Sequence, residues 1–212
     1  MRAASATMQS ANRSWRRAEL CRLRNTAQSL RFGSPLYSAA NPEQPVVCLT
    51  PEGERSLAPM RWGFKLPDRF LFNTRSETVE QSRFWKESFR ERRCIVPADA
   101  FFEWGSASAK SRKKFEISLV RAELFGLAGI WSPWQNPRTG QWEQAFSILT
   151  TEANEAMRPI HDRQPEILAP GEYAEYLAPA PRPPVHLLRI LPCEAMRITE
   201  SAANAPVQGS LF

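Results

Sequence analysis

The chain from Pro45 onward is divided into short apolar segments, and turn residues separate these segments from one another. Residues 46–49 form one such segment, which ends at Pro51-Glu52-Gly53, and residues 57–64 follow as its expected hairpin partner. Segments of this length favour β-strands over helices. A chain of many short strands and few helices predicts an α+β fold whose core is a mainly antiparallel, barrel-like sheet.

The same pattern predicts where the remaining elements lie. Further strands are expected at residues 93–96, 101–104, 115–120, 124–131, 145–149 and 186–191. Helices are expected over residues 80–89, where Trp85 and Phe89 share one face, around residues 152–157 and over residues 171–177. Residues 106–114 predict a loop and residues 136–140 a turn. With 212 residues, 42% of them hydrophobic, the chain is long enough to bury one core.

The basic charge of the chain is concentrated at its N-terminal end. Residues 1–40 contain one acid and seven arginines, and their net charge of +6 equals that of the whole chain. We expect a basic arm over residues 1–34, one domain over residues 35–200 and a flexible tail over residues 201–212. A basic arm suits contact with nucleic-acid phosphates, and a disordered tail or an organelle transit peptide are the alternatives. No apolar run is long enough to cross a membrane. The protein is expected to be a monomer.

The four cysteines are scattered along the sequence, at positions 21, 48, 94 and 193. None forms a Cys-x-x-Cys or Cys/His pair with the spacing of metal ligands. This pattern predicts a reducing compartment, no disulfide framework, no metal site and no cofactor. Cys48 and Cys94 lie within apolar runs and are expected to be core thiols.

Three short runs that lie far apart in the sequence, residues 73–78, 94–104 and 160–163, carry candidate reactive side chains. Aromatic residues flank Glu103, and they would desolvate its carboxylate and raise its pKa, as a general acid or base near neutral pH requires. His161 precedes Asp162 and Arg163, where an imidazole could move a proton. The alternatives are a surface-facing Glu103 on an alternating strand and a structural His161 capped by local backbone.

Asn73 and Arg75 alternate along one extended segment, so their side chains are expected on one face. An amide such as that of Asn73 can polarise a carbonyl oxygen, and a guanidinium such as that of Arg75 can hold a phosphate by two hydrogen bonds. The alternative for Arg75 is a surface ion pair with Glu77.

Four sequence runs, taken together and in this order, are specific enough to suggest a family: NTRSET, RRCIVPADAFFEW, LAGIW and ILTTEANEAMRPIHDRQPEIL. They resemble the SOS response-associated peptidase family, the abasic site processing proteins with the SRAP domain. The resemblance covers roughly residues 35–200. It implies an SRAP-type fold, a role in DNA damage repair within the SOS response, and a cytoplasmic, nucleoid-associated protein whose partner is single-stranded DNA with abasic sites.

The resemblance also implies a chemistry. In the family, the free N-terminal cysteine condenses with the aldehyde of an abasic site and closes a thiazolidine, which leaves a covalent protein–DNA link; a self-processing peptidase step removes the leader residue. Asn73 would then hold the cysteine or the sugar, Glu103 would move protons, and His161 would assist ring opening and reversal. Thr150 would line the pocket. The expected DNA contacts are Arg22, Arg24, Phe70, Arg75, Thr150 and Arg163.

The N-terminus departs from the family pattern, in which Cys directly follows Met. The sequence starts Met1-Arg2-Ala3, and Cys21, within Leu20-Cys21-Arg22, is the best candidate for the nucleophile. Whether this is an enzyme therefore depends on Cys21 gaining a free amine, either by a start at Leu20 or by removal of residues 1–20. The alternative is an incidental thiol. The family often has a Trp near residues 66–69 that wedges against bases, and Phe70 is the expected substitute.

The C-terminal residues Gln208, Leu211 and Phe212 form a Q-x-x-L-F pattern. It resembles the short peptide that docks on the bacterial sliding clamp, which makes the clamp a second expected partner; a frayed tail is the alternative. Two other functions stay open from sequence. One is a non-catalytic relative that binds DNA or the clamp, and the other is a cysteine peptidase acting on other proteins, although no nucleophile signature surrounds Cys21.

Overall fold

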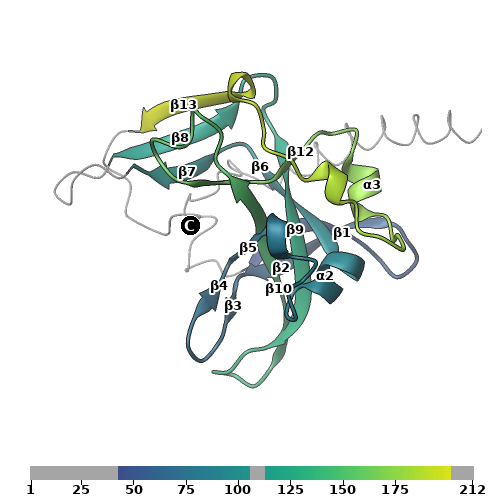
Figure 1. The fold of residues 1–212 in the computed structure, drawn as a ribbon. Coiled ribbons are helices and arrows are strands. Elements are labelled where there is room, and N and C mark those ends of the chain that lie inside the picture. The colour runs from purple at the N-terminus through teal and green to yellow at the C-terminus, as the bar shows by residue number, and fades with distance from the viewer. Residues whose placement is uncertain (1–42, 106–112, 202–212) are drawn as a thin grey trace, which may run out of the picture. The chain divides into compact units, whose positions relative to one another are not determined.

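A computed structural model describes residues 43–105 and 113–201 (Figure 1). The chain divides into two units, Met1–Leu30 and Arg31–Phe212, and all described residues belong to the second. Several residues with expected roles lie outside the described ranges: Cys21, Arg22, Arg24, Gln208, Leu211 and Phe212.

An eight-stranded mixed sheet forms the core of the described part. Its strand order is β11-β10-β2-β1-β6-β9-β12, with β5 also paired to β10 and β9 paired to β10. The bounds are β1 Glu43–Leu49, β2 Arg55–Trp62, β5 Asn73–Arg75, β6 Arg93–Ala98, β9 Phe125–Gln135, β10 Trp142–Glu152, β11 Arg163–Pro165 and β12 Ile167–Leu168.

The sheet is mainly antiparallel, as expected, but it is mixed because β10 runs parallel to β2 and to β5. The barrel-like description holds only loosely. Residues Ala145 and Phe146 alone join β10 to β2, and the single pair Val47–Ile95 joins β1 to β6. With two such short seams, the core is a curled mixed sheet and not a closed barrel.

The two longest strands, β9 and β10, form a hairpin across the turn at residues 136–140. Gly140 has a φ of +71°, which a residue without a side chain adopts without strain. Side chains from both strands, among them Leu127, Ile130 and Phe146, are completely buried. Burial of such side chains is the main favourable term in folding, and this hairpin therefore carries the centre of the core.

A second, three-stranded sheet has the order β13-β8-β7, from strands Met196–Ser201, Lys114–Leu119 and Phe101–Trp104. A small hairpin joins β3 (Phe64–Lys65) to β4 (Phe70–Leu71). The helices are short: α2 Lys86–Glu91, α3 Tyr173–Leu177, and the 3-10 turns η2 Ser76–Thr78, η3 Val185–Leu187 and η4 Cys193–Ala195. In Figure 1, α2 and α3 lie beside the main sheet.

Three sequence predictions of elements were wrong or too long. The helix expected over residues 80–89 starts only at Lys86, because the Ser82 hydroxyl accepts the Trp85 N–H and favours a turn there. No helix forms around residues 152–157, because Asn154 turns the chain by accepting the Met157 N–H with its side chain. Instead of a strand at residues 186–191 there is η3, and the last strand is β13.

Arg93, at the start of β6, anchors both α-helices to the sheet. It is 4% exposed, and its guanidinium donates to the carbonyl oxygens of Phe89 (2.6 Å), Arg90 (2.6 Å), Tyr176 (2.5 Å) and Ala178 (2.6 Å). These carbonyls lie at the C-terminal ends of α2 and α3, where helices have unpaired acceptors. One buried cation thereby satisfies the ends of two helices.

Candidate functional site

The candidate site is built around one end of β10, where β5 and β11 pair with it on opposite sides. Ile148 lies opposite Asn73 and Thr150 opposite Arg75 in the parallel pairing with β5. Thr150 also lies opposite Pro165 in the antiparallel pairing with β11. This topology brings the first and third reactive runs of the sequence together, although nearly ninety positions separate them.

Asn73 presents a buried amide that the described residues leave unsatisfied. Both Nδ2 and Oδ1 are buried and have no hydrogen-bond partner within the described part of the chain. An unpaired buried amide costs about 1–3 kcal/mol, so such a group usually awaits a partner. The next residue, Thr74, forms a 2.8 Å hydrogen bond between its Oγ1 and Ser147 Oγ of β10.

Arg163 is the centre of a hydrogen-bond network that fixes this end of the sheet. Its guanidinium donates to Glu77 Oε1 (2.7 Å) and Oε2 (2.9 Å), and to the carbonyl of Thr150 (2.6 Å). Arg163 lowers the pKa of Glu77, mainly through this hydrogen bond. The surface pair considered between Arg75 and Glu77 is therefore wrong, because Glu77 pairs with Arg163 instead.

Thr150, expected to line the pocket, is 2% exposed. Its carbonyl also accepts the Ser76 hydroxyl at 3.1 Å, and its own hydroxyl donates to the Thr74 carbonyl at 3.5 Å. Its contacts with described residues thus tie β5 and η2 to β10. Arg163 likewise has its guanidinium engaged within the protein.

His161 lies just before β11, and its side chain is 24% exposed. Its Nδ1 lies 3.0 Å from the backbone N of Arg163 and 3.1 Å from Asp162 Oδ1. The backbone N–H can only donate, so Nδ1 is the acceptor and the ring proton is on Nε2; Asp162, 85% exposed, is free to turn to solvent. The local backbone cap given above as the alternative for His161 is therefore present.

Glu103 lies on β7, in the three-stranded sheet, opposite Phe115 of β8. It is completely buried, so the alternative of a surface-facing carboxylate is wrong. Its strand neighbours Phe102 and Trp104 point to the opposite face, since side chains alternate along a strand. Glu103 thus comes from a different sheet than Asn73 and His161.

Two candidate DNA contacts are accessible. Arg75 is exposed, and its charge is a minor cause of the lowered pKa of Glu77, although among the described residues Glu77 forms its hydrogen bonds with Arg163. Phe70, on β4, is 50% exposed and stacks on Phe72, with the two ring centroids 5.7 Å apart. An exposed cation and an exposed ring are the groups that contact phosphates and bases.

Of the cysteines within the described ranges, two are core thiols, as expected. Cys48 and Cys94 are buried, and burial raises the pKa of both, that of Cys94 well above its ordinary value. A raised pKa disfavours the thiolate and hence nucleophilic attack. Cys193, in η4, is partly exposed.

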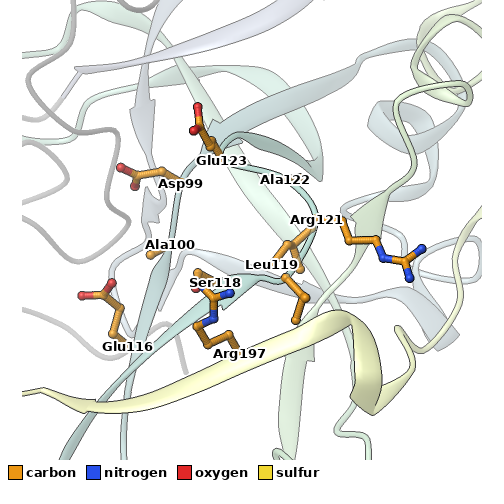
Figure 2. Close-up of a pocket in the computed structure, with 10 residues that line it drawn as sticks. Asp99, Ala100, Glu116, Ser118, Leu119, Arg121, Ala122, Glu123 and Arg197 are labelled. Atoms are coloured by element: carbon orange, nitrogen blue, oxygen red, sulfur yellow. The ribbon is translucent and has the colours of Figure 1, made fainter.

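A pocket of about 500 Å³ lies on the three-stranded sheet. Figure 2 shows Asp99, Glu116, Ser118 and Arg197 around it. None of the residues with an expected role lines it. Within residues 43–105 and 113–201, no group of His, Cys, Asp or Glu could hold a metal ion, and no helix there has the length and apolar character of a membrane span.

Comparison with known proteins decides the family. The model of the SOS response associated peptidase (SRAP) family matches residues 3–206. The chain belongs to the SRAP family. Two relatives from Bacillus subtilis are the abasic site processing proteins YoaM and YoqW, 32% and 31% identical over 190 residues each; the matches cover 83% of this chain and 82% and 84% of those proteins.

A solved structure supports the same placement. The crystal structure of a protein from Bacteroides thetaiotaomicron is 26% identical to this SRAP chain, with a TM-score of 0.64 over 75% of this chain and 73% of that one. The chain therefore shares its fold with this solved structure, in agreement with the SRAP-type fold that the sequence motifs predict.

Three residues of the site were missed in the sequence: Ser76, Glu77 and Ser147. Ser76 and Glu77 lie within the NTRSET run, but only the pairing of β5 with β10 shows what they contact. Ser147 carries no local signal at all.

Proposed function

We propose that this SRAP protein binds single-stranded DNA, recognises abasic sites and links to them covalently through a thiazolidine. The observation that carries the proposal is the buried amide of Asn73, which has no hydrogen-bond partner among the described residues and lies on β5, paired with β10. At the same end of β10, Arg163 bonds to the Thr150 carbonyl and to the His161 ring. Such an amide is a ready donor and acceptor for a sugar or aldehyde oxygen. The names of the SRAP relatives, which process abasic sites, point to the same substrate.

In the proposed reaction, the α-amine of an N-terminal cysteine attacks the aldehyde carbon of the ring-opened abasic site. The adduct loses water to give a Schiff base, and the thiol then adds to the same carbon and closes the ring, so that one water leaves overall. Glu103 and His161 supply and accept the protons, Glu103 from a water-poor position and His161 through Nε2–H. Arg75, exposed beside Asn73, binds a phosphate.

We propose Cys21 as the cysteine. Cys48 and Cys94 are buried with raised pKa values, and neither can present an α-amine from within a strand. Cys21 lies in Leu20-Cys21-Arg22, where either a start at residue 20 followed by hydrolytic removal of that initiator residue, or removal of residues 1–20, would expose its amine. A self-processing step would then belong to the same site. Docking of Gln208, Leu211 and Phe212 on the sliding clamp is a separate proposal that rests on the sequence pattern alone.

The test is to mix the protein with a single-stranded oligonucleotide carrying one abasic site and to look for a complex that survives denaturation. The wild type and Cys193→Ala should form it, and Cys21→Ala should not. Peptide mass measurement of the linked form should identify Cys21 as its N-terminal residue. If no complex survives, but binding to the same oligonucleotide weakens with salt, the protein is a non-covalent DNA-binding relative. Persistence of intact residues 1–20 in the linked form would refute the role of Cys21.

A further inference from the structure

Lys114 is a buried cation beside the strand that carries Glu103, and the proposed reaction does not use it. It lies at the start of β8, is 8% exposed, and is paired with Trp104 at the end of β7. Lysine is rarely buried to this extent, because its ammonium group loses hydration. Burial accordingly lowers the pKa of Lys114, while the negative charge of Glu116 opposes that shift. A lysine in this position needs a contact that compensates for the lost water.

The compensating contact of Lys114 is an aromatic ring. Its Nζ lies 4.2 Å from the centroid of the Phe102 ring, and Phe102 itself is only 7% exposed. The face of a ring attracts a cation, and this attraction is strongest where water is excluded. The preceding residue, Lys113, has different surroundings, since its side chain is 53% exposed and pairs with Glu200 at 2.9 Å. Two adjacent lysines thus differ in both burial and partner.

The register of β7 and β8 decides which side chains share a face of this sheet. Phe102 lies opposite Glu116 and Trp104 lies opposite Lys114, so Lys114 reaches the Phe102 ring diagonally across the two strands. Glu103 lies between the two aromatic residues and points to the other face, because side chains alternate along a strand. Lys114 is therefore bound to the residues on both sides of Glu103, to one by its side chain and to the other by strand pairing.

The strand β7 is short and lies at the end of its sheet. It has four residues, and β8 is its strand partner within the described part of the chain. The N–H of Gly105, which donates to the Lys113 carbonyl at 2.9 Å, extends this pairing by one residue. Because the side-chain period of a strand is two, a slip of one residue would turn Glu103 to the opposite face. The same slip would move the Phe102 ring away from Lys114, so their contact favours the observed register.

We propose that Lys114 is a positioning residue whose ammonium group, bound to the Phe102 ring, holds β7 in the register that the DNA reaction requires of Glu103. This inference rests on the proposed function, in which Glu103 moves protons. Lys114 lies on the other face of the sheet from Glu103 and takes no part in those proton transfers. An arginine at position 114 fulfils the same role, because a guanidinium also binds to the face of an aromatic ring.

The experiment measures the maximal rate of cross-linking to a single-stranded abasic oligonucleotide and the DNA concentration that gives half of this rate. Lys114→Leu removes the cation and keeps an apolar side chain, and it should lower the maximal rate about tenfold while the half-saturating DNA concentration stays unchanged. Lys114→Arg keeps a cation and should restore most of the rate. Lys113→Leu, at the exposed neighbour, is the matched control and should react like the wild type. All rates are compared at a temperature at which circular dichroism shows each variant to be folded.

Phe102→Leu tests whether the effect passes through the ring. It should slow the reaction as Lys114→Leu does, and the double variant should be no slower than the slower single variant, because both substitutions remove one contact. Effects that multiply in the double variant would overturn the proposal, and so would an unchanged maximal rate in Lys114→Leu. A higher half-saturating DNA concentration with an unchanged maximal rate would instead make Lys114 a DNA contact.

A second measurement needs no DNA. Amide hydrogen exchange, followed by mass spectrometry, should be faster over β7 in Lys114→Leu than in the wild type, whereas exchange over β9 and β10 should not change. Equal exchange over β7 in a protein that does cross-link refutes the role of Lys114 alone. Absence of cross-linking in the wild type refutes the proposed function, and the role of Lys114 in that reaction with it, whatever the exchange over β7.

Discussion

The pairing of Arg163 with Glu77 offers the sharpest test of how the site is held. Arg163 was expected from the sequence to contact DNA, but its guanidinium bonds to Glu77 and Thr150. The Arg163 side chain is 13% exposed and that of Glu77 is 41% exposed. We predict that Arg163→Met destabilises the protein more than it weakens DNA binding.

The magnitude follows from the three bonds. A partly exposed ion pair contributes about 0.5–1 kcal/mol, even when two-pronged. The bond to the buried Thr150 carbonyl adds about 1–1.5 kcal/mol, the net value of one hydrogen bond, because that carbonyl keeps the Ser76 hydroxyl as a second donor. Arg163→Met should therefore lower the free energy of unfolding by about 2 kcal/mol, which corresponds to about 4–8 °C in Tm for a chain of this size.

A double-mutant cycle isolates the pair. Urea unfolding of the wild type, Arg163→Met, Glu77→Gln and the double variant should give a coupling energy of about 0.5–1 kcal/mol at neutral pH. Because Arg163 lowers the pKa of Glu77, this coupling is present above the ordinary Glu value, 4.5, and is lost as the pH falls through the folded value. Arg182→Met, at an exposed arginine, is the control. Zero coupling together with weakened DNA binding would refute the structural role and restore Arg163 as a DNA contact.

Two further predictions concern the scaffold. Arg93→Met should lower the free energy of unfolding by about 3–5 kcal/mol, because four carbonyls at two helix ends lose a buried cation; a loss below about 1 kcal/mol in urea unfolding would contradict this anchoring. Gly63→Ala should cost more than Gly140→Ala, although both have positive φ, because a Cβ at Gly63 would lie 2.5 Å from Phe70 Cζ while Gly140 has open space; equal costs would show that Phe70 yields freely.

Much of the sheet could be predicted from the sequence, because its strands are marked by apolar runs between turn residues. Strands β1, β2, β6, β8 and β9 lie where expected within a few residues. Two of the failures share one cause. At residues 80–84 and 152–157 the polar side chains of Ser82 and Asn154 bond to nearby backbone and favour turns over a helix, a competition that apolar periodicity does not register.

The site could be predicted only in part, for a related reason. The motifs identified Asn73, Glu103 and His161 as side chains of interest. The structure shows that Glu103 is buried and that β5 and β11 both pair with one end of β10, and the roles of these side chains stay predictions. What the sequence could not provide was which charged groups pair. Arg75 and Glu77 are neighbours along the chain, whereas Glu77 and Arg163 meet only because β5 and β11 both pair with β10.

Because Glu77 pairs with Arg163 and not with Arg75, the two arginines have different surroundings. Arg163 neutralises Glu77 and holds the Thr150 carbonyl, and its backbone N–H orients the His161 ring. With Glu77 bonded to Arg163, Arg75 is left exposed. If Glu77 paired with Arg75, the phosphate contact and the support of β10 would compete for one cation. If Arg75 binds phosphate as proposed, the pairing of Glu77 with Arg163 leaves phosphate binding and support of β10 to separate arginines, and Glu77→Gln should weaken the support of His161 before it alters contact with phosphate.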